Sequence, residues 1–224
     1  MIEVVFIDID NTLLDFNQSS KLSVKKAFSN FGLPYKDSDY VVFKTINDQL
    51  WKKIERGELD RKGLHNVRFP LVLKELGVDF DGLKVETEFR KVLAQTACLV
   101  DGALETLKYL CGKYKVYGAT NAIYDLQVNR LTSAGLYQYF SGLFVSEKIG
   151  HNKPTKEFFD YCFSNIDGLK PSQAVMVGDS LTADIIGGKD YGMTTVWYNH
   201  DKLDMVSDKA DYKIDKLIDI KTVL

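Results

Sequence analysis

The chain has 224 residues, 45% of them hydrophobic, which is enough to bury a large core either as one domain with an insertion or as two small domains. Its 29 basic and 31 acidic residues nearly cancel, which excludes the broadly basic surface typical of proteins that bind nucleic-acid polymers. The sequence has neither an apolar run of membrane-spanning length nor the basic N-terminal region of a signal peptide, so we expect a cytoplasmic protein without membrane contact.

The first predicted element is a strand in the opening residues MIEVVFIDID. The run VVFI has the continuous apolar character of a strand buried in a parallel sheet, yet Asp8 and Asp10 follow it directly. A charge at the end of a buried strand is costly to desolvate unless another group pairs with it. Two neighbouring carboxylates require a cation or a shared proton. The opening residues therefore predict a site at the end of the first strand.

The next region, residues 16–97, has a helical pattern throughout. Apolar residues recur at a spacing of three to four in KLSVKKAFSNF, DYVVFKTINDQLWKKI, KGLHNVRFPLVLKEL and VETEFRKVLAQ. No strand signal interrupts this pattern in the sequence. We therefore predict a helical bundle over residues 16–97, inserted after the first strand.

Short β-rich runs that alternate with helical segments fill the rest of the chain. The predicted strands are KVYGATN, GLFVSE, AVMVGDS and TTVWYN. Strands that alternate with helices of this length indicate right-handed βαβ units and a parallel sheet. Beyond them, the stretch 201–211 has the acidic character of a solvated face and turn. The predicted fold class is α/β, with a Rossmann-like parallel-sheet core formed by residues 1–15 and 98–224.

Polar side chains gather at the predicted strand ends. They are Asp8, Asp10, Thr120, Asn121, Lys153, Asp179 and Asp184. In an open parallel sheet the ligand site lies outside the carboxyl ends of the strands, near the point where the strand order reverses. Carboxylate oxygens suit Mg²⁺, whereas hydroxyl, backbone N–H and ammonium groups suit phosphate oxygens. These ends therefore predict a site for a divalent cation and a phosphate group.

Four segments resemble the ordered motifs of the haloacid dehalogenase-like (HAD) hydrolases, a superfamily dominated by phosphatases. They are DIDNT at 8–12, ATN at 119–121, KP at 153–154 and GDSLTAD at 178–184. The helical insertion resembles the four-helix cap that follows the first motif in this superfamily. The DNTLLDF form of the first motif, together with the LW, IERGEL and RF stretches of the insertion, is most similar to the cytosolic pyrimidine 5'-nucleotidases of the YjjG type.

The resemblance and the chemistry together give the carboxylates their expected roles. Asp8 is expected to attack phosphorus and form an aspartyl-phosphate, and Asp10 to act as the acid and base. Mg²⁺ is the expected cofactor, held by Asp8, by the backbone carbonyl of Asp10 and by Asp179. The resemblance implies for Asp184 an outer-shell role at the metal, through water or through Lys153.

The remaining strand-end groups are expected to hold the phosphate. Thr120 and the backbone N–H groups around Asn11 and Asn121 are predicted to bind the phosphoryl oxygens, and Lys153 to neutralise the developing charge. Pro154 suits the first position of a helix and biases Lys153 away from helical geometry, so that its side chain projects into the site.

The predicted substrate is a small phosphorylated metabolite, with nucleoside monophosphates ahead of sugar phosphates. Phe16, Trp51 and Arg68 of the insertion suit the face and edge of a nucleobase, although side chains at helical spacing also suit core packing. We expect a monomer or a weak dimer.

Other functions remain open. A sugar-phosphate phosphatase and a phosphomutase, which returns the phosphoryl group to substrate, use the same fold. A phospho-acceptor switch like a response-regulator receiver also sets acids at strand ends, but receivers typically pair adjacent acids and carry no cap. Dehalogenation is disfavoured because it has no leaving alkoxide for Asp10 to protonate. Asp10 and Asp179 also have structural alternatives, as a turn residue and a helix N-cap.

Overall fold

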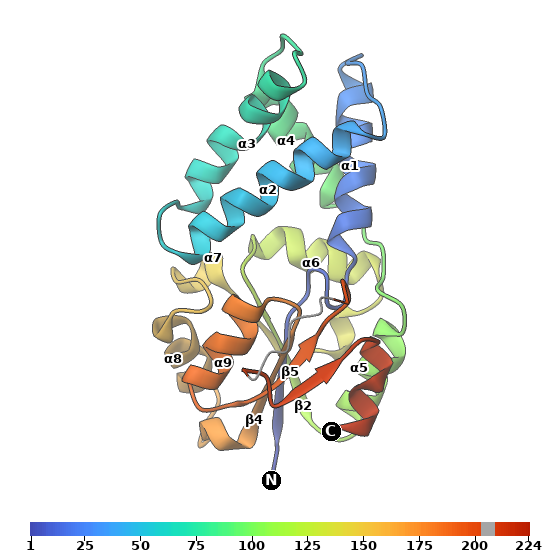
Figure 1. Cartoon of the computed structure of the whole chain (residues 1–224). Coiled ribbons are helices and arrows are strands. Elements are labelled where there is room, and N and C mark those ends of the chain that lie inside the picture. The colour runs from blue at the N-terminus through green and yellow to red at the C-terminus, as the bar shows by residue number, and fades with distance from the viewer. Residues whose placement is uncertain (203–208) are drawn as a thin grey trace. The chain divides into compact units, whose positions relative to one another are not determined.

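The computed structural model describes residues 1–202 and 209–224, so part of the predicted turn at 201–211 lies outside the described residues. The chain divides into two compact units (Figure 1). One unit contains residues 1–16 and 98–224, and the other contains residues 17–97. None of the helices in the described part of the chain has both the length and the apolar composition that crossing a bilayer requires.

A parallel sheet forms the centre of the first unit. In the described residues its strands are β1 (Val4–Ile7), β2 (Lys115–Thr120), β3 (Gly142–Val145), β4 (Ala174–Gly178), β5 (Thr194–Tyr198) and β6 (Tyr212–Ile214). They lie side by side in the order β3-β2-β1-β4-β5-β6, and every neighbouring pair is parallel. Strands β2 and β3 are added on one side of β1, and β4, β5 and β6 are then added on its other side. The strand order therefore reverses between β1 and β4, where ligands bind in open α/β sheets.

The pairing of β1 with its two neighbours determines where Asp8 lies along the sheet. All four residues of β1 are buried, as expected for a strand covered on both faces. Ile7 lies opposite Gly118 of β2 and Val177 of β4, and the N–H of Asp8 donates to the carbonyl of Val177 at 2.8 Å. This register places Asp8 level with the carboxyl ends of both neighbouring strands.

Helical segments of the first unit connect these strands. They are α5 (Ala103–Cys111), α6 (Tyr124–Ser133), η1 (Tyr137–Tyr139), α7 (Ser146–Ile149), α8 (Lys156–Ser164), η2 (Pro171–Gln173), η3 (Leu181–Ile186), α9 (Gly187–Asp190) and η4 (Leu217–Thr222). The apolar face of α8 shows how they pack: Phe158, Phe159 and Cys162 form one buried cluster with Phe6 of β1 and Met176 of β4. Burial of such faces is the main force that holds the helices on the sheet.

Two details of this unit differ from the sequence prediction. The sheet gains β6, a three-residue edge strand whose first two residues are exposed, so no apolar run marks it. The helical segment expected between the predicted strands AVMVGDS and TTVWYN begins with the π-helical turn η3 and continues as the short helix α9. A π-helical turn is frequent at functional sites, and this one carries Asp184.

Four helices form the second unit. They are α1 (Phe16–Asn30), whose first residue belongs to the other unit, α2 (Asp39–Glu55), α3 (Arg61–Glu75) and α4 (Gly82–Leu93). Their core contains a cluster of buried rings, in which Phe69 packs on Phe28, Phe43 and Phe89 with ring centroids 5.2 to 6.5 Å apart. Asp81 caps the start of α4 by accepting hydrogen bonds from two backbone N–H groups of its first turn.

Arg68 lies inside this core, where it binds other side chains of the same unit rather than the nucleobase predicted from the sequence. Its guanidinium donates to both carboxylate oxygens of Glu86, at 3.0 and 2.7 Å, and to Asn47 Oδ1 at 2.9 Å. It also lies 4.8 Å from the centre of the Phe89 ring. Arg68 is only 4% exposed. We therefore correct its assignment to core packing, the alternative that its helical spacing left open.

Replacing Arg68 with leucine should lower the free energy of unfolding by ~3–5 kcal/mol, because the buried carboxylate of Glu86 loses its bidentate partner. Arg90, whose Nε lies 3.5 Å from Glu86, offsets only part of this loss. Urea titration followed by circular dichroism measures the change.

The double variant Arg68→Leu/Glu86→Leu should lose less stability than Arg68→Leu, since it leaves no buried carboxylate without its cation. Lys21→Met is the matched control in the same unit, because its ion pair with Asp37 is exposed and contributes less than about 1 kcal/mol. A double variant as unstable as the sum of the two single variants would contradict this account of Arg68.

Candidate active site

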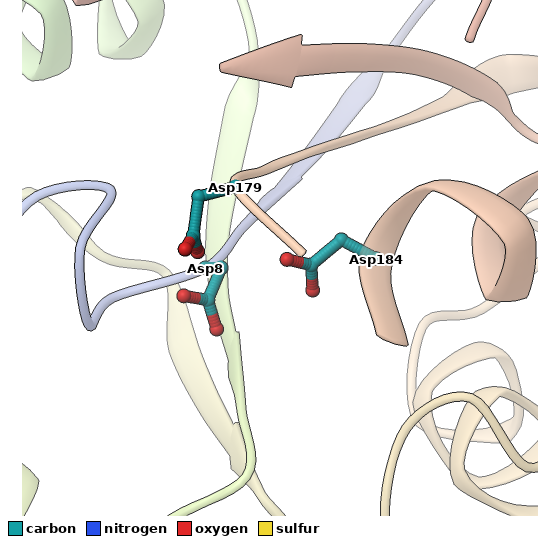
Figure 2. Close-up of side chains that lie close together, drawn as sticks. All are labelled: Asp8, Asp179 and Asp184. Atoms are coloured by element: carbon teal, nitrogen blue, oxygen red, sulfur yellow. The ribbon is translucent and has the colours of Figure 1, made fainter. Parts of the chain in front are cut away.

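Three aspartates meet at the carboxyl edge of the sheet, beside the reversal of strand order (Figure 2). Asp8 follows β1, Asp179 follows β4, and Asp184 lies on η3. One carboxylate oxygen of each lies within 4.8 Å of the others. Side chains separated by up to 176 positions in the sequence are therefore brought together because parallel strands end at one edge.

Lys153 is buried against this cluster and connects two of its members. Its Nζ donates to Asp8 Oδ1 at 2.7 Å, to Asp184 Oδ1 at 2.6 Å and to the carbonyl of Ala119 at 2.5 Å. Burial lowers the pKa of the Lys153 ammonium, but the carboxylates of Asp184 and Asp8 outweigh this effect and hold the pKa above its ordinary value. Lys153 is thus a fixed positive charge in contact with the predicted nucleophile.

The main chain of Lys153 is held by Asn121. The Asn121 side chain accepts a hydrogen bond from the N–H of Lys153 at 2.8 Å and donates to its carbonyl at 2.9 Å. The predicted place of Pro154 is wrong: α8 begins at Lys156, after the N-cap Thr155, and the Lys153–Pro154 peptide bond is cis. The side chain of Asn121 therefore positions Lys153, and the predicted role of the Asn121 N–H toward phosphate stays a prediction.

Asp184 is fixed by contacts on both carboxylate oxygens. Oδ1 accepts from Lys153, and Oδ2 accepts from the N–H of Ser180 at 3.1 Å. The carboxylate lies so close to Gly178 that a Cβ at that position would be 2.1 Å from Oδ2. Position 178 therefore requires glycine, because no other residue leaves room for the carboxylate.

Three contacts position Asp179. Thr12 Oγ1 donates to its Oδ1 at 3.4 Å, and Trp197 Nε1 donates to its main-chain carbonyl at 3.0 Å. His200 Nε2 lies 3.6 Å from its Oδ2. The sequence motifs give no sign of Trp197 or His200, since both belong to β5 or the loop after it.

The cluster has more negative than positive charge. Burial raises the pKa of Asp8 to about 7, although Lys153 opposes the shift, and burial likewise raises the pKa of Asp184 to about 6. Burial also raises the pKa of Asp179. The ammonium of Lys153 contacts two of the three carboxylates, and the third, Asp179, faces His200, whose imidazole pKa it raises. A divalent cation with a preference for oxygen ligands fits this donor set and would relieve the shortage of positive charge.

The side chain of Asp10 is bound by helix α6 rather than by the cluster. Its Oδ1 accepts from Arg130 Nη1 at 2.5 Å, and its Oδ2 accepts from Gln127 Nε2 at 2.8 Å. Gln127 Nε2 also lies 3.4 Å from Oγ1 of Thr120, which is buried at the end of β2. Sequence reasoning missed both α6 residues. Their signal is a polar pair three positions apart on the helix that follows the ATN motif.

The N–H of Asn11 donates to the carbonyl of Leu14 at 2.7 Å, so this group is already engaged. The predicted binding of phosphate by the N–H groups around Asn11 therefore stays a prediction for its neighbours. Asn11 has a φ of 60°, a left-handed conformation that asparagine tolerates better than most residues. Asn11 therefore shapes the turn after Asp10.

Phe16 and Trp51 are the remaining residues predicted to contact substrate. Phe16 is the first residue of α1 and is half-buried. Trp51 is also half-buried and packs against an apolar cluster made by Leu50, Ile54 and Leu64. Their contact with a nucleobase stays a prediction.

Several known proteins are similar to this chain over most of its length. The HAD-hydrolase YfnB of Bacillus subtilis is 35% identical over 221 residues, which cover 98% of this chain and 94% of YfnB. The pyrimidine 5'-nucleotidase PynA of Streptococcus pneumoniae is 34% identical over 87% of this chain and 83% of its own length. The pyrimidine 5'-nucleotidase YjjG of Escherichia coli is 30% identical over 87% of this chain and 85% of its own length.

A solved structure and a family model agree with these relatives. The crystal structure of YfnB bound to magnesium superposes with a TM-score of 0.93 at 34% identity, covering 100% of this chain and 98% of that one. The α/β parallel-sheet fold predicted from the sequence is confirmed. The family model for haloacid dehalogenase-like hydrolases matches residues 2–192. The chain therefore belongs to the haloacid dehalogenase-like hydrolases, as its four motifs predicted.

Proposed function

We propose that this hydrolase is a Mg²⁺-dependent phosphomonoesterase that acts on nucleoside 5'-monophosphates, with pyrimidine nucleotides as the preferred class. The observation that carries the proposal is the buried contact between Lys153 and Asp8, set among carboxylates at the switch point of the sheet. The names of PynA and YjjG support the nucleotide class. The magnesium in the YfnB structure supports the choice of cation.

The residues present fit a bound magnesium ion. Asp8, Asp179 and the main-chain carbonyl of Asp10 would hold it, and Asp184 would act through Lys153. When bound, the cation offsets the repulsion between the Asp8 carboxylate and the phosphate.

The proposed reaction has two displacements at phosphorus. In the first, a carboxylate oxygen of Asp8 bonds to phosphorus while the bond between phosphorus and the ester oxygen breaks. The ester oxygen keeps the electron pair of the broken bond and accepts a proton from Asp10. In the second, a water oxygen attacks phosphorus and gives a proton to Asp10, and the electron pair of the breaking bond returns to Asp8. Thr120 binds a phosphoryl oxygen in both steps, and the positive charge of Lys153, whose three N–H groups are engaged, neutralises the developing negative charge.

The residues at the sheet edge bind the phosphate group, so other residues must recognise the rest of the substrate. We assign this role to the helical unit, as the cap of the enzyme, with Trp51 as the candidate that stacks on the base. A sugar-phosphate phosphatase would use the same sheet edge, and substrate comparison distinguishes it from a nucleotidase. A mutase would require a bisphosphate for activity.

Two substitutions test the roles of the carboxylates. Asp8→Asn should abolish turnover and phosphoenzyme formation, because a neutral amide is a poor nucleophile and removes one charge from the cation site. Asp10→Asn should lower kcat by about a hundredfold or more for alkyl phosphates but less for aryl phosphates, whose leaving group needs less protonation. Steady-state kinetics with one ester of each kind measures both effects. Equal losses on the two esters would argue against Asp10 as the leaving-group acid.

The raised pKa values predict how pH affects the metal-free protein. The folded-state pKa of Asp8 is about 7 and its ordinary value is 3.8, so the folded state binds the proton more tightly than the unfolded state does. The stabilising contribution of Asp8 is therefore largest below its ordinary pKa and is lost as the pH rises through about 7. The Tm without Mg²⁺ should fall as the pH rises from about 5 to about 8.

Added Mg²⁺ should raise the Tm more at about pH 8 than at about pH 5, since the cation and protons compete for the same carboxylates. Thermal melts with and without Mg²⁺ at both pH values measure the difference. Asp8→Asn is the matched variant, and its metal-free Tm should depend less on pH. A Mg²⁺ effect that is larger at the acidic pH would contradict this charge balance.

Phosphate release across a panel of substrates tests the function as a whole. Pyrimidine nucleoside monophosphates should give a higher kcat/KM than sugar phosphates of similar size, excess chelator should remove the activity, and Mg²⁺ should restore it. Full activity in excess chelator would refute the proposed mechanism. A wide preference for sugar phosphates would refute the nucleotide assignment and leave the mechanism standing.

A further inference from the structure

We propose that Arg130 and Gln127 are the positioning residues of the Asp10 carboxylate, and that Gln127 sets its spacing from Thr120. This inference rests on the proposed function, which makes Asp10 the acid and base. The three side chains form a closed set of contacts: Asp10 accepts from both α6 residues, and Arg130 Nη1 also donates to Gln127 Oε1 at 3.0 Å. The two residues are three positions apart on α6 and so share one face of the helix.

The three side chains of this set differ in how far they are buried. The side chains of Arg130 and Gln127 are fully buried, whereas that of Asp10 is 29% exposed. The contacts therefore extend from the interior of the unit to a carboxylate that solvent reaches. At the surface, the bonds of a long side chain rotate freely. Packing fixes the rotamer of a buried arginine, so its guanidinium holds a carboxylate in one position more firmly.

Stability alone does not explain a buried arginine at this place. Desolvation of a guanidinium and a carboxylate costs about as much as their attraction returns, and apolar side chains of similar volume are often as stable or more stable. A buried polar set is better explained by the geometry that it imposes. Here that geometry belongs to the residue that must give and take a proton.

The donors leave Asp10 able to exchange its proton. A carboxylate has about four lone-pair positions, and Arg130 and Gln127 use one on each oxygen. The guanidinium stays protonated at all relevant pH values and has no acceptor, so it donates to Oδ1 whether or not Asp10 carries a proton. Arg130 therefore fixes the carboxyl group through both halves of the reaction without taking the proton itself.

Gln127 couples this carboxyl group to the phosphate-binding end of β2. Its Nε2 lies 2.8 Å from Asp10 Oδ2 and 3.4 Å from Thr120 Oγ1. The leaving oxygen must lie beside Asp10 while the phosphoryl oxygens lie beside Thr120, so the distance between these two residues decides whether proton transfer coincides with bond breaking. A misplacement of the reacting groups by about 1 Å costs about a hundredfold in rate.

Kinetics of Arg130→Met, Arg130→Lys and Gln127→Leu test the proposal, with Mg²⁺ saturating and one alkyl and one aryl phosphate as substrates. Arg130→Met should lower kcat about a hundredfold for the alkyl ester and much less for the aryl ester, with little change in KM. Arg130→Lys, which keeps the charge but not the fork, should recover part of the loss. Gln127→Leu should lower the alkyl-to-aryl ratio of kcat in the same direction and shift the pH profile of kcat.

Leu131→Ala is the matched control. Leu131 is equally buried on the same helix, and its hydrocarbon side chain cannot bind a carboxylate. This variant should lower the Tm and leave the alkyl-to-aryl ratio unchanged. If Arg130→Met does not fold, the Gln127→Leu and Arg130→Lys variants decide the question.

The outcome separates this proposal from the proposed function. A wild-type protein that releases no phosphate from any ester would refute the proposed function before any variant is made. An active wild type whose variants lose both esters equally, or keep the wild-type pH profile and ester ratio, would overturn the positioning role of Arg130 and Gln127.

Discussion

The site depends on one buried ammonium group, that of Lys153, between the carboxylates of Asp8 and Asp184. Each of these groups alone would be costly to bury, and each becomes tolerable only in contact with the others. Asp8 follows β1, Lys153 lies in the loop before α8 and Asp184 lies on η3 after β4, so the three groups meet only when all of these segments are in place. The contact that orients the proposed nucleophile therefore forms only in the completed fold.

This contact does not balance the charge. Asp179 adds a third carboxylate. The pKa of each of the three carboxyl groups is raised because burial outweighs the opposing effect of Lys153 and, at Asp179, of His200. The metal-free fold is thus destabilised at the place where the proposed reaction brings in a phosphate dianion. Such a cost is typical of active sites, where local stability is lower than packing alone would allow. A divalent cation would remove the cost and attract the phosphate with the same charge.

The sequence predicts this part of the molecule well for a physical reason. Strands β1 and β4 are buried on both faces, so they are continuous apolar runs, and charged residues directly after them mark the strand ends. Strand β6 has no such run, because two of its three residues face solvent, and it was missed. The contacts of Gln127 and Arg130 were missed because polar residues in a helix usually indicate an exposed face. Their burial depends on Asp10, which lies 120 positions from Arg130.

The two buried arginines show why burial by itself does not identify a function. Arg68 and Arg130 obey the same rule, since each is buried with a carboxylate partner. The partner of Arg68 is Glu86, which is buried as deeply as the arginine, so the pair connects two helices of one core. The partner of Arg130 is Asp10, which is partly exposed and follows the proposed nucleophile Asp8 by two positions in the sequence. A buried cation therefore indicates chemistry when the carboxylate that it holds is one that solvent and substrate can reach.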